Sequence, residues 1–236
     1  MTDMTAPPEL LSDPLPADPL QLASQWLAEA YRLGLQPNPN AMTLATSTPA
    51  GQPSARVVLC KELVAIPGYL AFYTNYRSRK GDDLAANPRA AAVLYWDYLH
   101  RQVRIEGIVV KAPEQDSDAY FASRALQSRI GAWASAQSQP LQSRSQLLAA
   151  VAAVARRFGI ERAAEDRREP EDQPAAGGPV PRPPHWGGYR LWAEAVELWV
   201  EGEARIHDRA RWSRALAQHP DGRIEPAAWR ATRLQP

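Results

Sequence analysis

Three short runs of basic residues stand out in a chain that has 27 Lys and Arg residues and 26 Asp and Glu residues. The first run, residues 56–61, has the composition of a β-strand, in which alternate side chains point to opposite faces. Arg56 and Lys61 then lie on opposite faces, where they could bind two different anions. A solvated strand edge, on which a lysine discourages aggregation, is the alternative interpretation.

The second run, residues 73–80, leaves one predicted strand and enters a predicted helix. It contains Tyr73, Thr74, Arg79 and Lys80. Backbone N–H groups and the dipole at a helix N-terminus attract phosphate, and basic side chains there complete an anion site. The glycine spacing of a P-loop is missing. A capped surface helix explains the same residues equally well.

The third run lies on a strand expected at residues 204–214. There Arg205, His207 and Arg209 share one face and Asp208 points to the other. Cations at successive positions of one face repel each other unless an anion or an acceptor ring lies between them, so this run favours a ligand site. Four His residues and one Cys without ligand spacing argue against zinc, and a Gly-x-Ser-x-Gly hydrolase motif is missing.

A fourth group consists of Tyr120, Arg124 and Ser128, each four residues from the next. If one helix continues through them, a phenol, a guanidinium and a hydroxyl share a helical face. All three donate hydrogen bonds, which suits a phosphate. An ordinary half-exposed helix face is the alternative.

Closely spaced β-prone runs must position these groups, and they predict an antiparallel sheet or barrel. Asp18 and Pro19 begin a first helix, which Gly34 ends. Strands are expected at residues 41–47, 55–63, 69–74, 90–96, 102–110, 189–193, 195–200, 204–214 and 228–234, and further helices at 78–86, 116–124, 129–134 and 143–158. Residues 1–17 are predicted to form a disordered arm, and residues 18–236 a single domain with a loop rich in proline and charge at 159–184.

The composition excludes several classes of protein. The near-neutral charge argues against nucleic-acid binding. A single cysteine, Cys60, rules out an intramolecular disulfide. Apolar stretches are far shorter than the roughly 20 residues that span a bilayer, and we see no secretory signal, so a cytoplasmic protein is expected.

Taken in order, these segments resemble the pyridoxine/pyridoxamine 5′-phosphate oxidase family from about Asp18 to Pro236. Each motif is weak alone, but so many in one order are specific. The motifs are Arg-x-x-Leu-x-Lys from Arg56, Phe-Tyr-Thr-Asn from Phe72, Ser-Arg-Lys from Ser78, Arg-Gln-Val from Arg101, Tyr-Phe-x-Ser-Arg from Tyr120, Ile-Gly-Ala-Trp from Ile130, Gln-Ser from Gln137, Trp-Gly-Gly-Tyr-Arg from Trp186, Glu-x-Trp from Glu197, Arg-Ile-His-Asp-Arg from Arg205 and Arg-Leu-x-Pro from Arg233.

The resemblance implies an α+β, mainly β fold, an FMN-binding split β-barrel with peripheral helices. FMN would bind in clefts between the subunits of a homodimer. Carried over by position, the cofactor-binding residues would be Arg56, Val57, Val58, Leu59, Cys60, Lys61, Tyr73, Thr74, Arg79, Lys80, Gln102, Gln137, Ser138, Trp199 and Arg209. The substrate-binding residues would be Lys61, Tyr120, Arg124 and Ser128 at the phosphate and Arg205, Ile206 and His207 over the pyridine ring, with Arg205 and His207 as the catalytic residues.

The activity implied is oxidation of pyridoxamine or pyridoxine 5′-phosphate to pyridoxal 5′-phosphate. By this resemblance, FMN would take a hydride equivalent from C4′, and O₂ would reoxidise it to give hydrogen peroxide. Two alternatives remain: a related FMN oxidase that acts on a phenazine-type aromatic, and a non-catalytic module that binds flavin or pyridoxal phosphate. Lys61, Tyr120 and Arg124 argue against the phenazine enzyme, because relatives of that type tend to lose the substrate-phosphate cations. Arg205 and His207 argue against the non-catalytic module.

Overall fold

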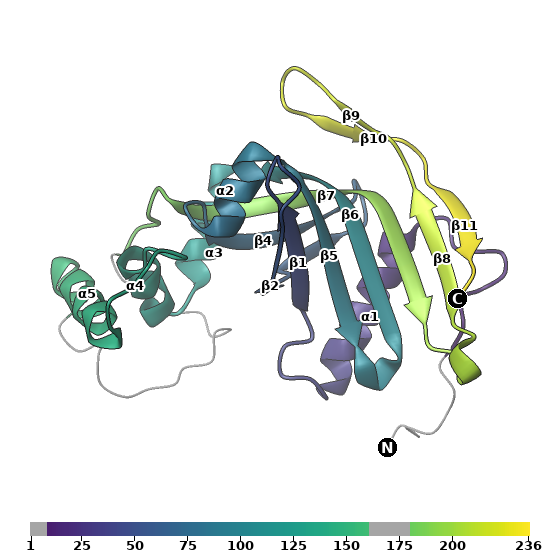
Figure 1. Ribbon diagram of the computed structural model, residues 1–236, viewed down its shortest axis with the longest axis horizontal. Helices are drawn as coiled ribbons and strands as arrows, with labels where there is room; N and C mark the ends of the chain where they lie inside the picture. The colour runs from purple at the N-terminus through teal and green to yellow at the C-terminus, as the bar shows by residue number, and fades with distance from the viewer. Residues whose placement is uncertain (1–8, 161–179) are drawn as a thin grey trace. The chain divides into compact units, whose positions relative to one another are not determined.

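The computed structural model describes residues 9–160 and 180–236. It is mainly β, as the sequence predicts, and Figure 1 labels its five helices and all strands except β3. The strands are β1 Ala41–Ser47, β2 Pro53–Leu59, β3 Glu62–Val64, β4 Tyr69–Asn75, β5 Arg89–Trp96, β6 Arg101–Lys111, β7 Trp186–Val200, β8 Asp208–Ser213, β9 Leu216–Gln218, β10 Ile224–Pro226 and β11 Arg230–Leu234. The helices are α1 Pro19–Leu33, α2 Arg79–Ala86, α3 Glu114–Ser123, α4 Leu126–Ala134 and α5 Arg144–Arg157, with short 3₁₀ turns η1 Asp97–Leu99 and η2 Glu203–Arg205.

One sheet organises the fold. Its strand order is β11-β8-β7-β6-β5-β1-β2, β4 joins it beside β7, and β3 pairs with β4. The registers β1–β2, β1–β5, β5–β6, β7–β8 and β8–β11 are all antiparallel. Strands β9 and β10 form a separate hairpin that the sequence did not predict.

Alternating side chains give this sheet one apolar and one polar face. In β1, Met42 and Leu44 are buried while Thr43 between them is exposed. In β6, Val103 and Ile105 are fully buried, whereas Arg104 is only half-buried. A strand with period-two burial covers a core on one face and leaves the other face for charged or ligand-binding groups.

The first helix begins and ends as predicted. The Asp18 carboxylate accepts a hydrogen bond from the Leu20 amide at 2.8 Å and so caps α1, and Gly34 ends it in a left-handed conformation with φ 62°. Arg101, at the start of β6, lies 5.0 Å from the Trp26 ring centroid and bonds Glu29 at 2.5 Å. These contacts attach α1 to the sheet.

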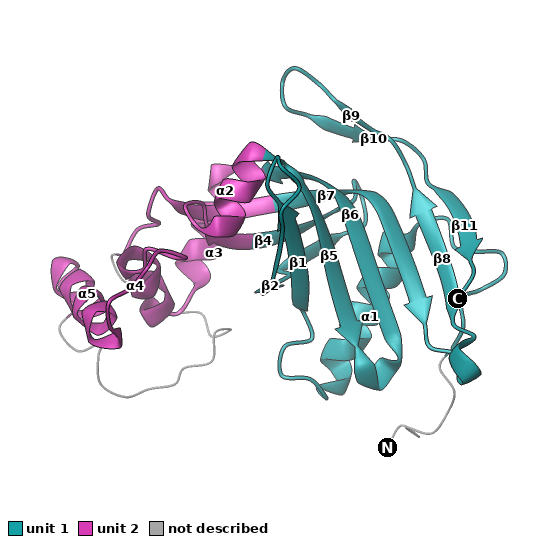
Figure 2. Ribbon diagram, viewed as in Figure 1, with its two compact units in different colours: residues 1–72, 87–110, 190–236 teal, residues 73–86, 111–189 magenta. Residues whose placement is uncertain are grey.

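The described residues form two compact units that the chain crosses repeatedly (Figure 2). Unit 1 comprises residues up to 72, 87–110 and 190–236. Unit 2 comprises residues 73–86 and 111–189. Unit 1 contains α1 and most of the sheet, and unit 2 contains α2, α3, α4 and α5.

The prediction of a strand at residues 204–214 is wrong for the first half of that range. Ala204 and Arg205 have φ values of 52° and 66° within η2, and β8 begins only at Asp208. The turn is tight, because a Cβ on Gly202 would lie 1.9 Å from the Ile206 carbonyl oxygen. The prediction that Arg205, His207 and Arg209 share one strand face is therefore also wrong.

The single helix expected through Tyr120, Arg124 and Ser128 is likewise wrong. Helix α3 ends at Ser123, Arg124 is extended with ψ 148°, and α4 starts after Ala125. The Ser123 hydroxyl donates to the Tyr120 carbonyl at 2.8 Å, so a side chain supplies a hydrogen-bond donor to a carbonyl of the last helical turn. Tyr120 and Ser128 belong to different helices.

Two further boundaries differ from the prediction. The strand expected at residues 55–63 stops at Leu59. Beyond it the Lys61 amide donates to the Ala71 carbonyl of β4 at 2.8 Å. The strands expected at 189–193 and 195–200 are one strand, the 15-residue β7. No helix among residues 9–160 and 180–236 is long and apolar enough to span a membrane.

Of the predicted N-terminal arm, residues 1–8 lie outside the described residues. Further along this arm, Leu11 is buried and its amide donates to the Asp208 carboxylate at 2.8 Å. The Trp212 indole donates to the Pro16 carbonyl at 2.8 Å. Most of the predicted loop, residues 161–179, also lies outside the described residues, so the domain boundaries stay a prediction.

Candidate functional site

A buried lysine is the centre of a polar cluster in unit 2. Lys80 is 7% exposed, and its Nζ donates to the Thr74 hydroxyl at 3.0 Å, the Ser78 hydroxyl at 3.1 Å and the Gln137 carbonyl oxygen at 2.9 Å. Thr74 also bonds Gln137 at 3.3 Å. The structure therefore brings together Thr74, Lys80 and Gln137, three of the predicted cofactor-binding residues.

The turn before α2 gives the two basic residues of this segment opposite environments. Asn75 accepts from the Arg77 amide at 2.8 Å, and the Ser78 hydroxyl donates to the Asn75 carbonyl at 2.7 Å. Helix α2 then starts at Arg79, which is exposed, and continues with the buried Lys80. The predicted placement of both basic residues at a helix N-terminus is confirmed.

An aromatic stack lies in the same unit. The Tyr73 ring lies 4.1 Å from the Tyr120 ring at an interplanar angle of 23°, and 5.7 Å from the Trp186 ring at 14°. The Arg124 guanidinium lies 4.8 Å from the Trp186 centroid. Tyr73, a predicted flavin residue, thus contacts Tyr120, a predicted substrate residue. Arg124 lies outside the helix that carries Tyr120, but it contacts the same aromatic stack through Trp186.

The remaining predicted residues of unit 2 are spread more widely. Ser128 is half-buried on α4. Ser138 is exposed and has a left-handed φ of 72°, next to the exposed Gln137. The backbone turns sharply here, which lets Gln137 reach Lys80 with its side chain while Ser138 faces solvent.

In unit 1, Arg56 on β2 is held against β1. Its guanidinium donates to the Thr46 hydroxyl at 2.7 Å, the Leu44 carbonyl at 3.2 Å and the Ser54 hydroxyl at 2.7 Å. Farther along this run, burial raises the pKa of the Cys60 thiol to about 12. Val57 is exposed, and Val58, Leu59 and Lys61 are half-buried.

A network of ion pairs covers the polar face of the sheet in unit 1. Glu197 on β7 is 3% exposed and accepts from Arg209 on β8, from Nε at 3.1 Å and from Nη2 at 2.8 Å. Its second oxygen lies 3.3 Å from Nη1 of Arg104 on β6. Gln102, a predicted cofactor residue two positions from Arg104, is half-buried on the same strand face.

The two predicted catalytic residues lie in the turn before β8. Arg205 and Ile206 are exposed, and the His207 ring lies 4.7 Å from the Trp199 ring. The Gly202 amide donates to His207 Nδ1 at 3.2 Å. This hydrogen bond uses the lone pair of Nδ1, so the ring proton of His207 lies on Nε2, which remains the donor of the imidazole.

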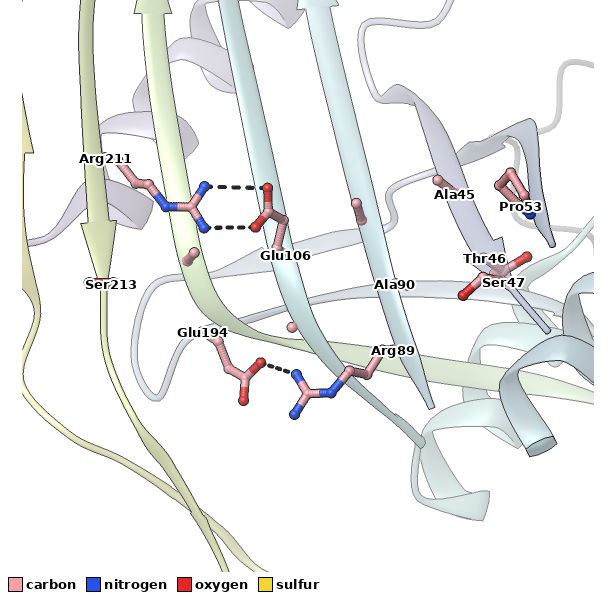
Figure 3. Close-up of a pocket in the computed structure, with 13 residues that line it drawn as sticks. Ala45, Thr46, Ser47, Pro53, Arg89, Ala90, Glu106, Glu194, Arg211 and Ser213 are labelled. Carbon is pink, nitrogen blue, oxygen red and sulfur yellow. Dashed lines mark hydrogen bonds and ion pairs between the residues drawn. The ribbon is translucent and has the colours of Figure 1, made fainter. Parts of the chain in front are cut away.

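A pocket of about 560 Å³ lies in unit 1, lined by residues of β1, β5, β6, β7 and β8 (Figure 3). Ion pairs cross it, from Arg211 to Glu106 at 2.8 Å and from Arg89 to Glu194 at 2.5 Å. Hydrogen bonds from Arg211 lower the pKa of Glu106 to about 2, and Arg104 contributes to the same effect. No predicted site residue lines this pocket, although Thr46 on its wall accepts from Arg56.

Comparison with known proteins shows which family the chain belongs to. The family model described as pyridoxamine 5′-phosphate oxidase matches residues 27–158, and the pyridoxine 5′-phosphate oxidase C-terminal dimerisation region matches residues 186–236. The chain belongs to the pyridoxamine 5′-phosphate oxidase family. The pyridoxine/pyridoxamine 5′-phosphate oxidase of Rubrobacter xylanophilus is 44% identical over 227 residues, 96% of this chain and 91% of the relative. That of Bordetella petrii is 47% identical over 231 residues, 96% of this chain and 93% of the relative.

Solved structures confirm the split-barrel fold expected of this oxidase family. PhzG from Burkholderia lata, solved in complex with tetrahydrophenazine-1-carboxylic acid, has a TM-score of 0.77 at 28% identity and covers 98% of this chain and 100% of its own. A pyridoxamine 5′-phosphate oxidase-related, FMN-binding protein from Nostoc punctiforme has a TM-score of 0.62 at 15% identity, covering 94% of this chain and 100% of its own. The second likeness supports the fold alone.

Sequence reasoning assigned no role to Glu197, Arg104 or Trp186. Glu197 and Trp186 fall inside motifs of the oxidase family, but nothing in those motifs says what they contact. One signal was available in the sequence. Glu197 and Trp199 are two positions apart, as are Arg209 and Arg211, and this spacing places both members of a pair on one face of a strand. Opposite charges at that spacing on neighbouring strands indicate cross-strand ion pairs.

Proposed function

We propose that this chain is an FMN-dependent oxidase that converts pyridoxamine 5′-phosphate and pyridoxine 5′-phosphate to pyridoxal 5′-phosphate. The amine reaction consumes O₂ and water and releases ammonia and hydrogen peroxide, and the alcohol reaction consumes O₂ and releases hydrogen peroxide. The observation that carries this proposal is the Tyr73–Tyr120 stack at 4.1 Å. It joins a polar cluster suited to a flavin to a cationic cluster suited to a substrate phosphate.

The chemistry of the donor groups fits FMN. Arg56 and Arg79 would hold its phosphate, because guanidinium groups form strong charge-assisted bonds to phosphate. The Lys80 ammonium, whose three N–H groups donate to Thr74, Ser78 and Gln137, would add its positive charge. Around the ring we assign mainly amides, hydroxyls and flat side chains, which suit its polar edges and faces: Tyr73, Thr74, Gln102, Gln137, Ser138, Trp199 and Arg209, with residues 57–61 as backbone neighbours. When bound, FMN supplies the hydride acceptor and the route of the electrons to O₂.

The substrate would be anchored at its phosphate by Lys61, Tyr120, Arg124 and Ser128. Anchoring far from the reacting carbon supplies orientation energy, so these residues hold C4′ in position for transfer. Arg205, Ile206 and His207 would cover the pyridine ring. With Nδ1 occupied by the Gly202 amide, His207 offers a hydrogen-bond donor at Nε2, a role in orienting the substrate rather than in removing a proton.

We further propose a cytoplasmic homodimer with two equivalent FMN sites. The C-terminal match to a dimerisation region supports the dimer, and twofold symmetry is the commonest arrangement of identical chains. Light scattering of the flavin-loaded protein should give twice the mass of the 26.1 kDa chain. An active, FMN-loaded monomer would contradict this part of the proposal.

The likeness to PhzG supports a second candidate, an oxidase of a phenazine precursor. The relatives named pyridoxine/pyridoxamine 5′-phosphate oxidase are more similar, at 44% and 47% identity against 28%. Steady-state turnover separates the two functions. We expect peroxide release with pyridoxamine 5′-phosphate and little with pyridoxamine, which lacks the phosphate. Turnover of a reduced phenazine carboxylic acid alone would favour the second candidate, and no turnover with either would favour a non-catalytic module.

A further inference from the structure

Glu197 is the most deeply buried carboxylate with a described ion pair on the polar face of unit 1. It is 3% exposed, and both of its oxygens have arginine partners, Arg209 on one side and Arg104 on the other. Burying a carboxylate is costly unless its charge is paired and its oxygens are hydrogen-bonded. The Glu197 carboxylate is both paired and hydrogen-bonded. The arginines therefore fix the position of the carboxylate, and the carboxylate fixes the positions of the arginines.

The orientation of Arg209 follows from this pair. Its Nε and Nη2 donate to one oxygen of Glu197, and its Nη1 donates to the Gln235 carbonyl at 3.0 Å. A guanidinium has five N–H groups, of which these bonds use three. Within the described part of the chain, two N–H groups of this partly exposed guanidinium therefore remain for a ligand.

The surrounding residues identify the kind of ligand. Arg209 lies directly opposite Trp199 in the β7–β8 register, so a flat aromatic side chain and a fixed planar donor are neighbours on one sheet face. Arg104, Arg209 and Arg211 face Glu197 and Glu106, which leaves this network with a net positive charge. A flat heteroaromatic ring with hydrogen-bond acceptors at its edge matches both features.

We infer that Glu197 is a positioning residue for the flavin, acting through Arg209. Its carboxylate fixes the guanidinium plane so that the two remaining N–H groups meet an acceptor edge of FMN. Arg104 neutralises the other carboxylate oxygen. This inference rests on the proposed function, since it assigns a role toward the cofactor of that reaction.

A matched control lies on the same sheet face. Glu106 on β6 also pairs with two arginines, Arg104 at 2.5 Å and Arg211 at 2.8 Å, but does not contact Arg209 among the described hydrogen bonds. Glu106→Gln removes a carboxylate from the same network without changing a partner of Arg209. A purely structural role of the network predicts similar effects of the two substitutions, whereas a positioning role predicts different ones.

The test is a double-mutant cycle on FMN affinity, measured by quenching of flavin fluorescence on titration into the apoprotein. Glu197→Gln should weaken FMN binding roughly tenfold in the wild-type background and less than about twofold in the Arg209→Ala background. Glu106→Gln should change FMN affinity less than about twofold. The absorption band of the bound flavin should shift in Glu197→Gln and stay unchanged in Glu106→Gln.

The outcomes are distinguishable. A wild-type chain that binds no FMN would overturn the proposed function itself. Equal losses for Glu197→Gln with and without Arg209 would overturn only the positioning role, because the effect would not pass through Arg209. If Glu197→Gln does not fold, Glu197→Asp keeps the charge but shortens the side chain. It should lose affinity only where Arg209 is present, and an equal loss without Arg209 would again overturn the inference.

Discussion

The ion-pair network of unit 1 and the Lys80 and Arg124 groups of unit 2 contact their charged side chains through different described partners. In unit 1, Arg209 and Arg211 pair with the carboxylates Glu197 and Glu106. In unit 2, Lys80 donates to hydroxyl and amide oxygens, and Arg124 lies over the face of Trp186. A carboxylate partner cancels most of a cation's charge, whereas a hydroxyl, an amide oxygen or a ring face orients a cation through dipolar and cation–π contacts.

We expect a separate task for each of these two groups of side chains. Lys80 and Arg124 of unit 2 are assigned to the two phosphates, so we expect phosphate binding to depend on them, together with Arg56 and Lys61 of unit 1. Cations fixed by carboxylates suit directional hydrogen bonds to neutral acceptors, so we expect unit 1 to orient a ring. Four experiments, taken from the largest expected effect to the smallest, test this division.

Replacing Lys80 should have the largest effect. In Lys80→Met, the oxygens of Thr74, Ser78 and Gln137 lose a charged donor. Bonds to charged groups contribute about 1.5–3 kcal/mol each and are not additive, so we expect a loss of about 3 kcal/mol in the free energy of unfolding, measured with urea, and a large loss of FMN affinity. Lys111→Met is the control: its exposed Nζ lies 4.7 Å from the Tyr76 ring, and its loss should cost less than about 1 kcal/mol. Equal effects would remove the distinction between these lysines.

Arg124→Ala should separate the two anion sites. We expect substrate affinity to fall about ten- to a hundredfold, the equivalent of about 1.5–3 kcal/mol, with FMN affinity largely retained. Arg79→Ala should do the reverse. Both variants are titrated with FMN and with pyridoxal 5′-phosphate. An Arg124→Ala variant that loses FMN and keeps the substrate would show that the basic groups are wrongly divided between the ligands.

Trp186→Phe should weaken substrate binding more modestly, because the smaller ring orients Tyr120 and Arg124 less well. Stacking and cation–π contacts contribute about 0.5–1.5 kcal/mol, so pyridoxal 5′-phosphate affinity should fall about two- to tenfold. Trp133→Phe is a matched control, since Arg157 lies over Trp133 at the same 4.8 Å. An equal loss of affinity in the control would attribute the effect to general packing of unit 2.

Glu106→Gln should have the smallest effect, and that effect should depend on pH. Arg211 and Arg104 lower the pKa of Glu106 from 4.5 to about 2, so its ionised form stabilises the fold above about pH 4.5, and this contribution is lost as the pH falls toward 2. Glu106 is partly exposed, so the contribution is below about 1 kcal/mol. Urea unfolding of both proteins between pH 7 and pH 3 should show the difference shrinking with acidity. A constant difference would exclude the ion pair as its cause.

Much of the fold could be predicted from local sequence signals. The Asp18 cap, the Gly34 stop and the β-prone runs that form β1 and β6 are local, and the structure confirms them. The errors fall where the backbone leaves regular geometry. Residues 204–206 have strand-like neighbours in sequence, yet two of them adopt left-handed conformations that no residue type in the run demands.

The candidate site was predictable as a set of residues but not as a set of contacts. The basic runs identified Lys80 and Arg124, since their charges stand out in a nearly neutral chain. Their partners could not be predicted, because Gln137 and Trp186 lie 57 and 62 positions away in sequence. Pairings of that separation depend on the whole chain path, which no local pattern encodes.

The most direct test of the central claim is the visible spectrum of the purified protein under anaerobic conditions. We expect flavin absorption that bleaches on addition of pyridoxamine 5′-phosphate and returns on admission of air, with pyridoxal 5′-phosphate as the product. Because bleaching requires the bound flavin and the bound substrate together, it tests the flavin site and the substrate site at once. A colourless protein that cannot be reconstituted with FMN, or a yellow one that the substrate does not bleach, would contradict the account.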